Sequence, residues 1–148
     1  MKKHAGFTLI ELMIIIAIFA ILSAIATPNV IAWLRNSQFN TAVRDVKAVM
    51  GDMRMSAIKS NSDATIRFDG DNTYETEKRN RGTGNPPVPQ EHTLAAGISL
   101  TSDFSSNELT FGSRGMATEG TVTIQSDNGL CREIDVSRVG TSRIDTCP

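Results

Sequence analysis

Apolar residues are distributed unevenly along the chain. From Leu12 to Ala26 the sequence is apolar except for Ser23. The stretch 7–34 has about 28 residues, which gives about 42 Å as an α-helix and exceeds the roughly 30 Å of a bilayer core. The pattern therefore predicts a membrane-spanning helix over residues 7–34.

Two lysines, Lys2 and Lys3, precede this run. Lysines before an apolar segment suggest a secretory signal peptide, but this run is too long for one and continues into helix-like sequence. The lysines instead place the N-terminus in the cytoplasm and the following domain, 35–148, in the periplasm. We expect a single-pass protein of the inner membrane.

Pro28 interrupts the apolar pattern. A proline in a water-exposed helix interior costs about 3 kcal/mol, whereas in a membrane or a packed bundle it is tolerated as a kink or a locally unwound turn. We therefore expect a bend between Ser23 and Pro28.

After the proline the pattern becomes one-sided. Apolar residues recur at steps of three and four with charged residues between them, which is typical of an amphipathic helix that buries one face. We expect this helix over residues 35–60, ending near Lys59, Ser60 and Asn61, with its methionines as core filler. Its apolar positions are Phe39, Ala42, Val43, Val46, Val49, Met50, Met53 and Ala57.

From residue 63 the apolar pattern shortens to a period of two. The β-branched runs ATIRF, NTYETE, GISLT, ELTF, GTVTIQ, REIDVS and TSRID are separated by the turn signals DGDN, GSRG, SDNG and VGTS. They predict one antiparallel sheet of about five to seven strands within 63–148, and the fold class α+β. The segment 79–91, RNRGTGNPPVPQE, is interpreted as a loop. The sheet face that we expect to pack on the helix carries Ile66, Phe68, Leu109, Phe111, Val122, Ile124, Ile134 and Val136.

Candidate metal ligands are sparse. Asp69, Asp71 and Asn72 are spaced like the opening of a calcium loop, but the twelfth position of that loop is Asn80 instead of glutamate, so a hairpin turn is favoured. His92 is the one histidine beyond the leader, and no spacing resembles a zinc site. We expect neither a metal site nor a cofactor.

Composition limits the classes of function. The chain has 148 residues, of which 40% are hydrophobic and only 5% aromatic, and its formal net charge is -1. This balance argues against a generic nucleic-acid-binding protein, which usually has a strong basic excess, and leaves room for a local basic patch. The sequence offers no paired Ser–His–Asp or Cys–His set, which argues against an enzyme.

The two cysteines, Cys131 and Cys147, lie near the C-terminus. If the apolar segment exports the chain, the following domain meets an oxidising compartment, where such a pair is typical of a disulfide. The closed loop of about 17 residues would contribute roughly 3 kcal/mol in the chain-entropy model. Two free buried thiols are the alternative, followed by a metal site.

The N-terminal sequence KKHAGFTLIELMIIIAIFAILSAIATPN resembles the class III signal peptide of type IV pilins and type II secretion pseudopilins. The resemblance implies a type IV pilin-like fold and a leader, residues 1–6, that a prepilin peptidase removes by cutting between Gly6 and Phe7. It also implies N-methylation of Phe7, an assembly role for Glu11, and a helix-breaking proline at Pro28.

Glu11 is the one acidic residue in the apolar segment. A lone carboxylate in hydrocarbon is costly unless it finds a partner. When subunits stack in a filament, Glu11 of one could pair with the Phe7 amine of a neighbour, so that each charge relieves the cost of the other and the pair fixes the register. The alternative is that Glu11 snorkels to the lipid headgroups.

The stretches MRMSAIKSNSDATIRFDGDN, ELTFGSRGMATEGTVTI and REIDVSRVGTSRI resemble minor pilins of the GspH and FimT types. The likeness implies a minor pseudopilin of the type II secretion pseudopilus, which supports export of folded proteins across the outer membrane. The alternative is a FimT-like minor pilin that serves pilus assembly or DNA uptake. Implied partners are other pilin or pseudopilin subunits, the prepilin peptidase and the inner-membrane assembly platform.

A DNA role is weakened by one departure from the FimT pattern. Where FimT-like proteins often have Gly-Arg-x-Arg, a motif associated with DNA binding, this chain has Gly140, Thr141, Ser142 and Arg143. The first arginine is therefore missing. The remaining candidates for phosphate contacts are Arg114, Arg132, Arg138 and Arg143, with Lys78, Arg79 and Arg81 in the loop.

Overall fold

The structure, a computed structural model, describes residues 7–79 and 88–148. The chain divides into two compact units, Met1–Ser37 and Gln38–Pro148. One helix, α1 (Leu9–Ser60), begins in the first unit and ends in the second. The predicted end of the helix near Ser60 is confirmed. Helix α1 continues through Pro28 without a break in its helical structure. The bend expected between Ser23 and Pro28 stays a prediction.

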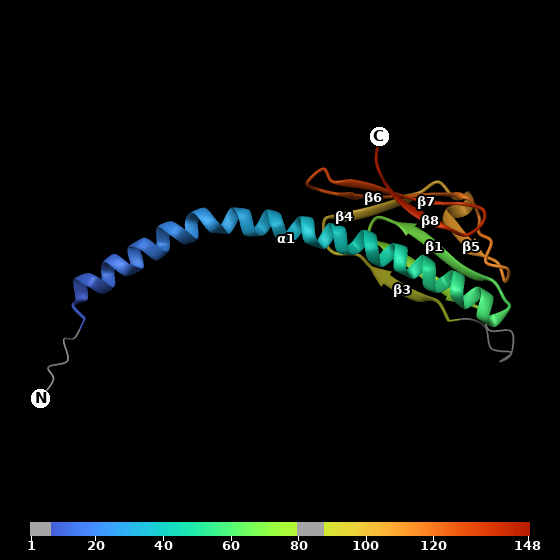
Figure 1. Cartoon of the computed structure of the whole chain (residues 1–148), viewed down its shortest axis with the longest axis horizontal. Coiled ribbons are helices and arrows are strands. Elements are labelled where there is room, and N and C mark those ends of the chain that lie inside the picture. Colours follow the sequence, from blue (N-terminus) through green and yellow to red (C-terminus); the bar gives the residue numbers. More distant parts are fainter. Residues whose placement is uncertain (1–6, 80–87) are drawn as a thin grey trace, which may run out of the picture. The chain divides into compact units, whose positions relative to one another are not determined.

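The described residues of the second unit form eight strands in two antiparallel sheets. The sheets have the strand orders β3-β2-β1-β5 and β4-β6-β7-β8 (Figure 1). A short 3-10 helix, η1 (Ser105–Asn107), precedes β5. The strands are β1 (Ala64–Gly70), β2 (Thr73–Lys78), β3 (Gln90–Thr93), β4 (Ile98–Ser102), β5 (Glu108–Phe111), β6 (Gly120–Ser126), β7 (Cys131–Val136) and β8 (Ser142–Thr146).

The prediction of antiparallel strands is confirmed, but that of a single sheet of five to seven strands is wrong. Strand β3 begins within the predicted loop 79–91. Its four residues, QEHT, are polar and show no apolar alternation, so the apolar pattern did not indicate a strand there. It is an edge strand that pairs only with β2, with Tyr74 opposite His92. Residues 80–87 of that predicted loop lie outside the described residues.

The predicted turn at DGDN is confirmed as a tight hairpin. Strands β1 and β2 pair antiparallel, with Gly70 opposite Thr73, so only Asp71 and Asn72 connect them. Asp71 has a φ of 53°, in the left-handed region that aspartate and asparagine tolerate better than most residues. Asp71 therefore has a local structural explanation.

The C-terminal half of α1 and both sheets share one hydrophobic core, and Figure 1 shows this half of the helix lying along the strands. All eight residues predicted for the inward sheet face are buried. They are divided between the sheets, four on β1 and β5 and four on β6 and β7. The predicted helix stripe is buried as well, with Val49 only partly so, and Met50 and Met53 fill the core. The apolar periodicity thus located the core correctly.

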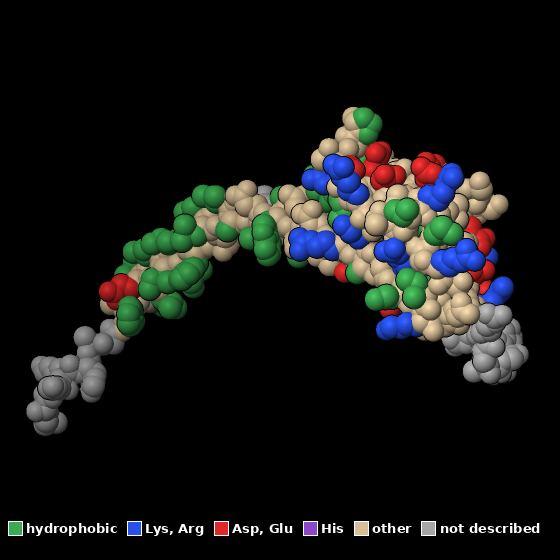
Figure 2. Space-filling view, turned by 45° about the vertical axis from the view of Figure 1, so that its right-hand side comes forward, with side chains coloured by type: hydrophobic (Ala, Val, Ile, Leu, Met, Phe, Trp, Pro, Cys, Tyr) green, Lys and Arg blue, Asp and Glu red, His purple; other side chains and the backbone are tan. Residues whose placement is uncertain are grey.

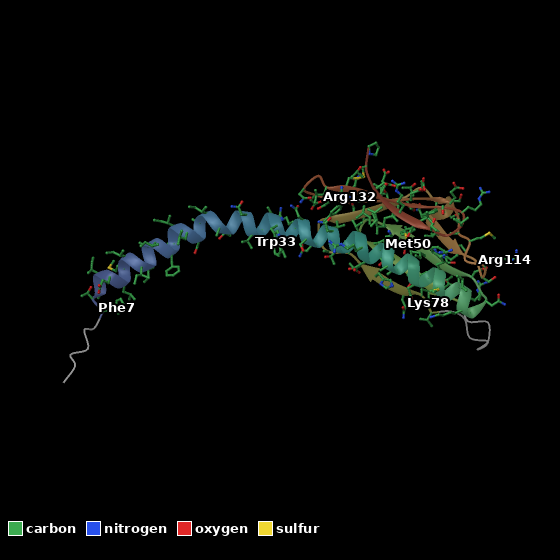
Figure 3. All side chains as sticks on the ribbon, in the orientation of Figure 1. Phe7, Trp33, Met50, Lys78, Arg114 and Arg132 are labelled. Carbon is green, nitrogen blue, oxygen red and sulfur yellow. A yellow bond between two sulfur atoms is a disulfide. The ribbon has the colours of Figure 1, made fainter. Side chains whose placement is uncertain are left out.

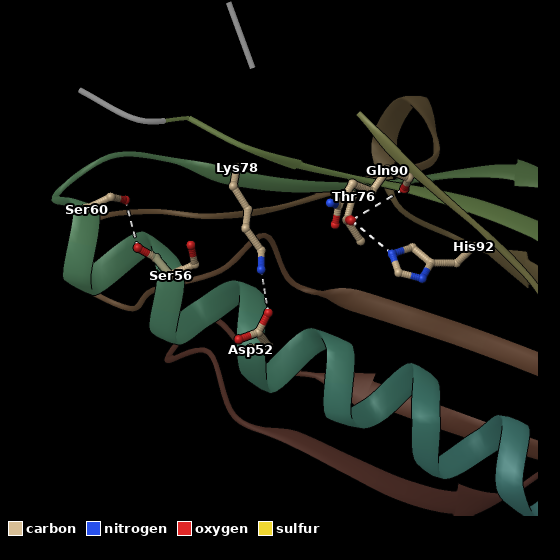
Figure 4. A network of polar contacts seen from close by, with 7 residues as sticks. All are labelled: Asp52, Ser56, Ser60, Thr76, Lys78, Gln90 and His92. Atoms are coloured by element: carbon tan, nitrogen blue, oxygen red, sulfur yellow. Dashed lines mark hydrogen bonds and ion pairs between the residues drawn. The ribbon is translucent and has the colours of Figure 1, made fainter. Parts of the chain in front are cut away.

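A small polar network joins β3, β2 and α1 (Figure 4). Thr76 is buried, its hydroxyl lies 3.1 Å from Nε2 of His92, and it donates to the Gln90 carbonyl at 3.4 Å. Lys78 Nζ donates to Oδ2 of Asp52 at 2.6 Å and so ties β2 to the helix. The contacts of Thr76 with Gln90 and His92 hold the polar edge strand that the apolar pattern did not indicate.

The predicted disulfide is confirmed: Cys131, the first residue of β7, is bonded to Cys147, which follows β8. The two Cα atoms are 5.7 Å apart, which lies within the usual range for a disulfide. The bond fixes the end of β8, the last strand of its sheet, to its neighbour β7.

Replacing both cysteines, with Cys131→Ser and Cys147→Ser, should lower the free energy of unfolding by roughly 3 kcal/mol, because the unfolded chain regains the entropy of the open loop. The measurement is thermal unfolding of the full chain in detergent, followed by circular dichroism with and without reductant. The double variant is its own control, since reductant should not change its melting temperature. An unchanged melting temperature of the wild type under reduction would contradict the role of the bond.

Candidate assembly site at the start of the helix

The first unit carries an apolar helix surface that the described chain leaves uncovered. Every large apolar side chain described from Phe7 to Leu34 is exposed, including Phe7 at 80% and Trp33 at 69%. Figure 2 shows this surface as a nearly continuous run of apolar side chains, and Figure 3 marks Phe7 and Trp33 on it. A water-soluble helix normally keeps one polar face, so this surface requires lipid or other protein chains around it. Among the described residues, α1 is the one helix long and apolar enough to cross a membrane.

Glu11 closes a hydrogen-bonded ring with Thr8 at the start of α1. Its Oε2 atom accepts hydrogen bonds from the backbone N–H of Thr8 at 2.9 Å and from the Thr8 hydroxyl at 3.0 Å. In return the N–H of Glu11 donates to Oγ1 of Thr8 at 3.3 Å. This reciprocal arrangement is a capping box, in which a threonine at the N-cap and a glutamate three residues later satisfy each other's backbone donors.

The capping box gives Glu11 a local role besides the one predicted from its charge. Thr8 stands three residues before Glu11, directly ahead of the apolar run, and this spacing is the sequence signal that was missed. A negative charge in the first turn is also favoured by the helix dipole. The predicted ion pair with a neighbouring subunit's Phe7 amine joins two chains and stays a prediction. Gly6 and the predicted cleavage site lie outside the described residues.

Near Pro28 the helix has an additional side-chain contact to its backbone. The Thr27 hydroxyl donates to the Ser23 carbonyl at 2.6 Å. Because proline has no N–H, the carbonyl that lacks its usual partner is that of Ala24, four residues before Pro28, and the Thr27 contact does not replace that bond. A threonine hydroxyl bonded to the carbonyl four residues back is a local contact that often bends helices.

The basic residues considered for nucleic acid are largely engaged within the second unit. Arg138 lies 3.4 Å from Glu119 and Arg143 lies 3.1 Å from Asp145. Arg132 donates to the carbonyl of the preceding Cys131 at 2.8 Å.

The same basic residues are also dispersed. Figure 3 shows Arg132 and Arg114 toward opposite ends of the second unit, with Lys78 on the strand that contacts α1 through Asp52. Arg79 is exposed, and Arg81 lies outside the described residues. Dispersed and paired charges make a weak phosphate-binding surface, so these contacts do not favour the alternative of a DNA role. Within residues 7–79 and 88–148, no three His, Cys, Asp or Glu side chains gather as a metal site.

Two family models match this chain. The prokaryotic N-terminal methylation motif matches residues 1–27, and the type II transport protein GspH matches residues 42–140, which is more than half of the chain. The first match covers the segment in which the sequence indicates cleavage and methylation. The second covers most of the unit that holds the two sheets.

Curated relatives match about a third of the chain. A fimbrial protein of Pseudomonas aeruginosa is 49% identical over 49 residues, which is 33% of this chain and 32% of that protein. The type IV major pilin protein PilA of Myxococcus xanthus is 49% identical over 47 residues, which is 32% of this chain and 21% of PilA. The chain therefore matches about a third or less of the length of these relatives.

Solved structures match the fold. The minor pseudopilin EpsH from the type 2 secretion system of Vibrio cholerae superposes with a TM-score of 0.61 at 18% identity, over 74% of this chain and 97% of EpsH. The type IV minor pilin FimU of Pseudomonas aeruginosa gives a TM-score of 0.59 at 19% identity, over 78% of this chain and 92% of FimU. At these identities the likeness establishes the fold, a long N-terminal helix packed on antiparallel sheets.

The methylation motif, the GspH match and the pilin fold agree with one another and with the exposed apolar helix. The chain belongs to the GspH family of type IV pilin-like proteins, which are structural subunits and not enzymes.

Proposed function

We propose that this chain is a minor pseudopilin of the type II secretion system. It assembles through its N-terminal helix into a periplasmic filament that supports export of folded proteins across the outer membrane. The observation that carries the proposal is the contrast along α1: its N-terminal half exposes apolar side chains all round, while its C-terminal half buries one face in a domain that the GspH family model largely covers.

The proposed path begins in the inner membrane. Residues 7–34 hold the precursor there, with the N-terminus in the cytoplasm and the domain 35–148 in the periplasm. A prepilin peptidase then cuts between Gly6 and Phe7 and methylates the new terminal amine of Phe7. The assembly platform transfers the subunit into the filament, where neighbouring helices take the place of lipid around the apolar surface.

The capping box and the ion pair between subunits are compatible. Oε2 of Glu11 receives both donors of Thr8, whereas Oε1 has no hydrogen-bond partner among the described residues. A carboxylate has about four lone-pair sites and can accept a further donor. Glu11 can therefore stay within its own capping box and bind the Phe7 amine of the next subunit.

The second candidate is a minor pilin of a type IV pilus. It is favoured by the 49% identity of about a third of the chain to a fimbrial protein, and the fold of FimU agrees with it. The GspH match covers residues 42–140, most of the second unit, and favours the secretion role.

Deleting the gene should separate the two candidates. A secretion subunit is required for release of a type II substrate, so the deletion strain should retain that substrate in the periplasm and still assemble surface pili. The measurements are the substrate's activity in medium and periplasm, and the amount of sheared pili. Complementation with the wild-type gene is the control. Normal secretion together with lost pili would overturn the secretion role and support the minor pilin.

Three substitutions separate the two roles of Glu11. Glu11→Gln keeps a capping residue but removes the charge, Thr8→Ala removes the cap but keeps the charge, and Glu11→Ala removes both. If the pair with the Phe7 amine holds the filament, Glu11→Gln and Glu11→Ala should reduce incorporation by at least about tenfold, because an unpaired buried amine is costly. Membrane insertion and processing should remain normal.

The assay for these variants is the ratio of subunit in sheared filaments to subunit in membranes, measured by immunoblotting. Thr8→Ala should lose much less than either glutamate variant. Normal incorporation of Glu11→Gln would show that the cap suffices and that no ion pair is needed.

Gly6→Glu should block removal of the leader, because the family's peptidase cuts after a glycine at this position. The expected product keeps residues 1–6 and has no methylated N-terminus, so intact mass spectrometry of the membrane fraction measures it directly. Ala5→Ser, one residue earlier, is the matched control and should be processed. A mature mass for the Gly6→Glu protein would contradict the assigned cleavage site.

A further inference from the structure

The second unit contains a groove of about 370 Å³ beside the C-terminal half of α1. Met50 and Phe111 give it apolar walls, and Arg54 lines it from the helix. Thr141 and Ser142 line it from the turn before β8 and from the first residue of that strand. The groove therefore lies between the exposed side of the helix and one edge of a sheet.

Gly51 lines the groove on the helix side, and nothing in its own chain requires a glycine there. A Cβ at this position would meet no heavy atom within 4 Å. Glycine in a helix interior is less stable than alanine, and Gly51 is exposed. Packing within the described chain therefore does not explain the residue. The open space above a glycine would let the backbone of another chain approach closely.

Exposed apolar side chains surround Arg54 at the rim of the groove. Arg54 donates from Nε to the Gly115 carbonyl and from Nη2 to the Val139 carbonyl, both at 2.9 Å, so it holds two turns against the helix. Large apolar side chains on the helix and on these turns are solvent-exposed: Met55, Ile58, Met116 and Val139. Figure 2 shows apolar and basic side chains next to one another on this unit. Clustered exposed apolar groups rimmed by polar ones mark interaction sites.

The edge of β8 offers unpaired backbone groups next to the groove. β8 is the last strand of its sheet, and the N–H of Ser137 donates to the Thr141 carbonyl at the turn into it. Because hydrogen-bonded and non-bonded pairs alternate in an antiparallel ladder, the backbone groups of Ser142, Ile144 and Thr146 point away from β7. The described residues give them no backbone partner. Such an edge is a template for an added strand.

Positive charge accompanies these features. Arg54 lines the groove, and Lys47 stands one helical turn before Gly51 on the same face of α1. Among the described residues, no carboxylate lies within ion-pair distance of either side chain. A bound segment with an acidic residue would therefore be electrostatically complementary.

We propose that this groove binds an extended segment of a different subunit of the same filament. The segment adds along β8, places apolar side chains against the exposed Met55 and Ile58, and carries a carboxylate opposite Arg54 and Lys47. A second copy of this chain is disfavoured, because an isologous contact would bring these positive charges together and close as a dimer instead of extending a filament. The inference rests on the proposed function, since it names another filament subunit as the partner.

Photocrosslinking in the native cell tests the proposal with the full chain. The photoreactive residue p-benzoylphenylalanine is introduced at Met55, on the groove rim, or at Thr101, on the exposed side of β4, as the matched control. Mass spectrometry of the crosslinked peptides from sheared filaments identifies the partner. The expected result is one other filament subunit, crosslinked from Met55 within a strand-forming segment that has Asp or Glu nearby.

Groove variants complete the test. Gly51→Leu should fill the open space and reduce the Met55 crosslink by at least about fivefold, whereas Thr101→Leu should not change it. Lys47→Glu, one turn before Gly51, should weaken it more than the same change at Lys59, which stands about two turns beyond Gly51 at the end of α1. Since leucine is a better helix former than glycine, the melting temperature of Gly51→Leu should not fall.

The outcomes separate this inference from the proposed function. Any one of three results would overturn the groove as the docking site. Met55 could crosslink only to copies of this chain or to lipid, it could give no product above the Thr101 control, or its product could be unchanged by Gly51→Leu. Those results would leave the proposed function intact as long as the subunit is recovered in sheared filaments. Absence of the wild-type chain from filaments would instead overturn the proposed function.

Discussion

The rest of this structure depends on one constraint: the N-terminal half of α1 has an apolar surface that no other described residue covers. Residues 7–34 expose large apolar side chains all round. Burying them in lipid or against other helices removes their apolar surface from water, which the small domain of the same chain does not do. Under the proposed function the same helix must suit two environments in turn, a bilayer and a bundle of subunits. Both demand that its backbone bonds be satisfied internally, which a continuous α-helix provides.

The change of pattern along α1 separates assembly from recognition. The C-terminal half of the helix buries a single face against two sheets, while its opposite face carries Lys47, Gly51, Met55 and Ile58 toward solvent. A helix that only stabilised its own domain would have a polar outer face with good helix formers. Glycine and two large apolar residues on that face are hard to explain by the stability of the domain and easier to explain by a partner.

The sequence located the helix, its end, the disulfide and the buried positions, because each rests on a strong local signal. Apolar periodicity identifies the inward side of a strand, but it does not say which sheet the strand joins, so two sheets were interpreted as one. Strand β3 was missed because QEHT is held by backbone pairing with β2 and by the bond between Thr76 and His92, not by apolar burial. Likewise Glu11 attracted attention through its charge, and the threonine three residues before it was passed over.

The capping box sharpens the question of why residue 11 is a glutamate. A glutamine can occupy the same position of a capping box, and its neutral amide is less costly than a carboxylate in apolar surroundings. The cap alone therefore does not explain the charge. The helix dipole offsets only part of the cost of a carboxylate in apolar surroundings. We propose that the terminal amine of a processed neighbouring chain, which assembly of the filament brings next to Glu11, offsets the rest.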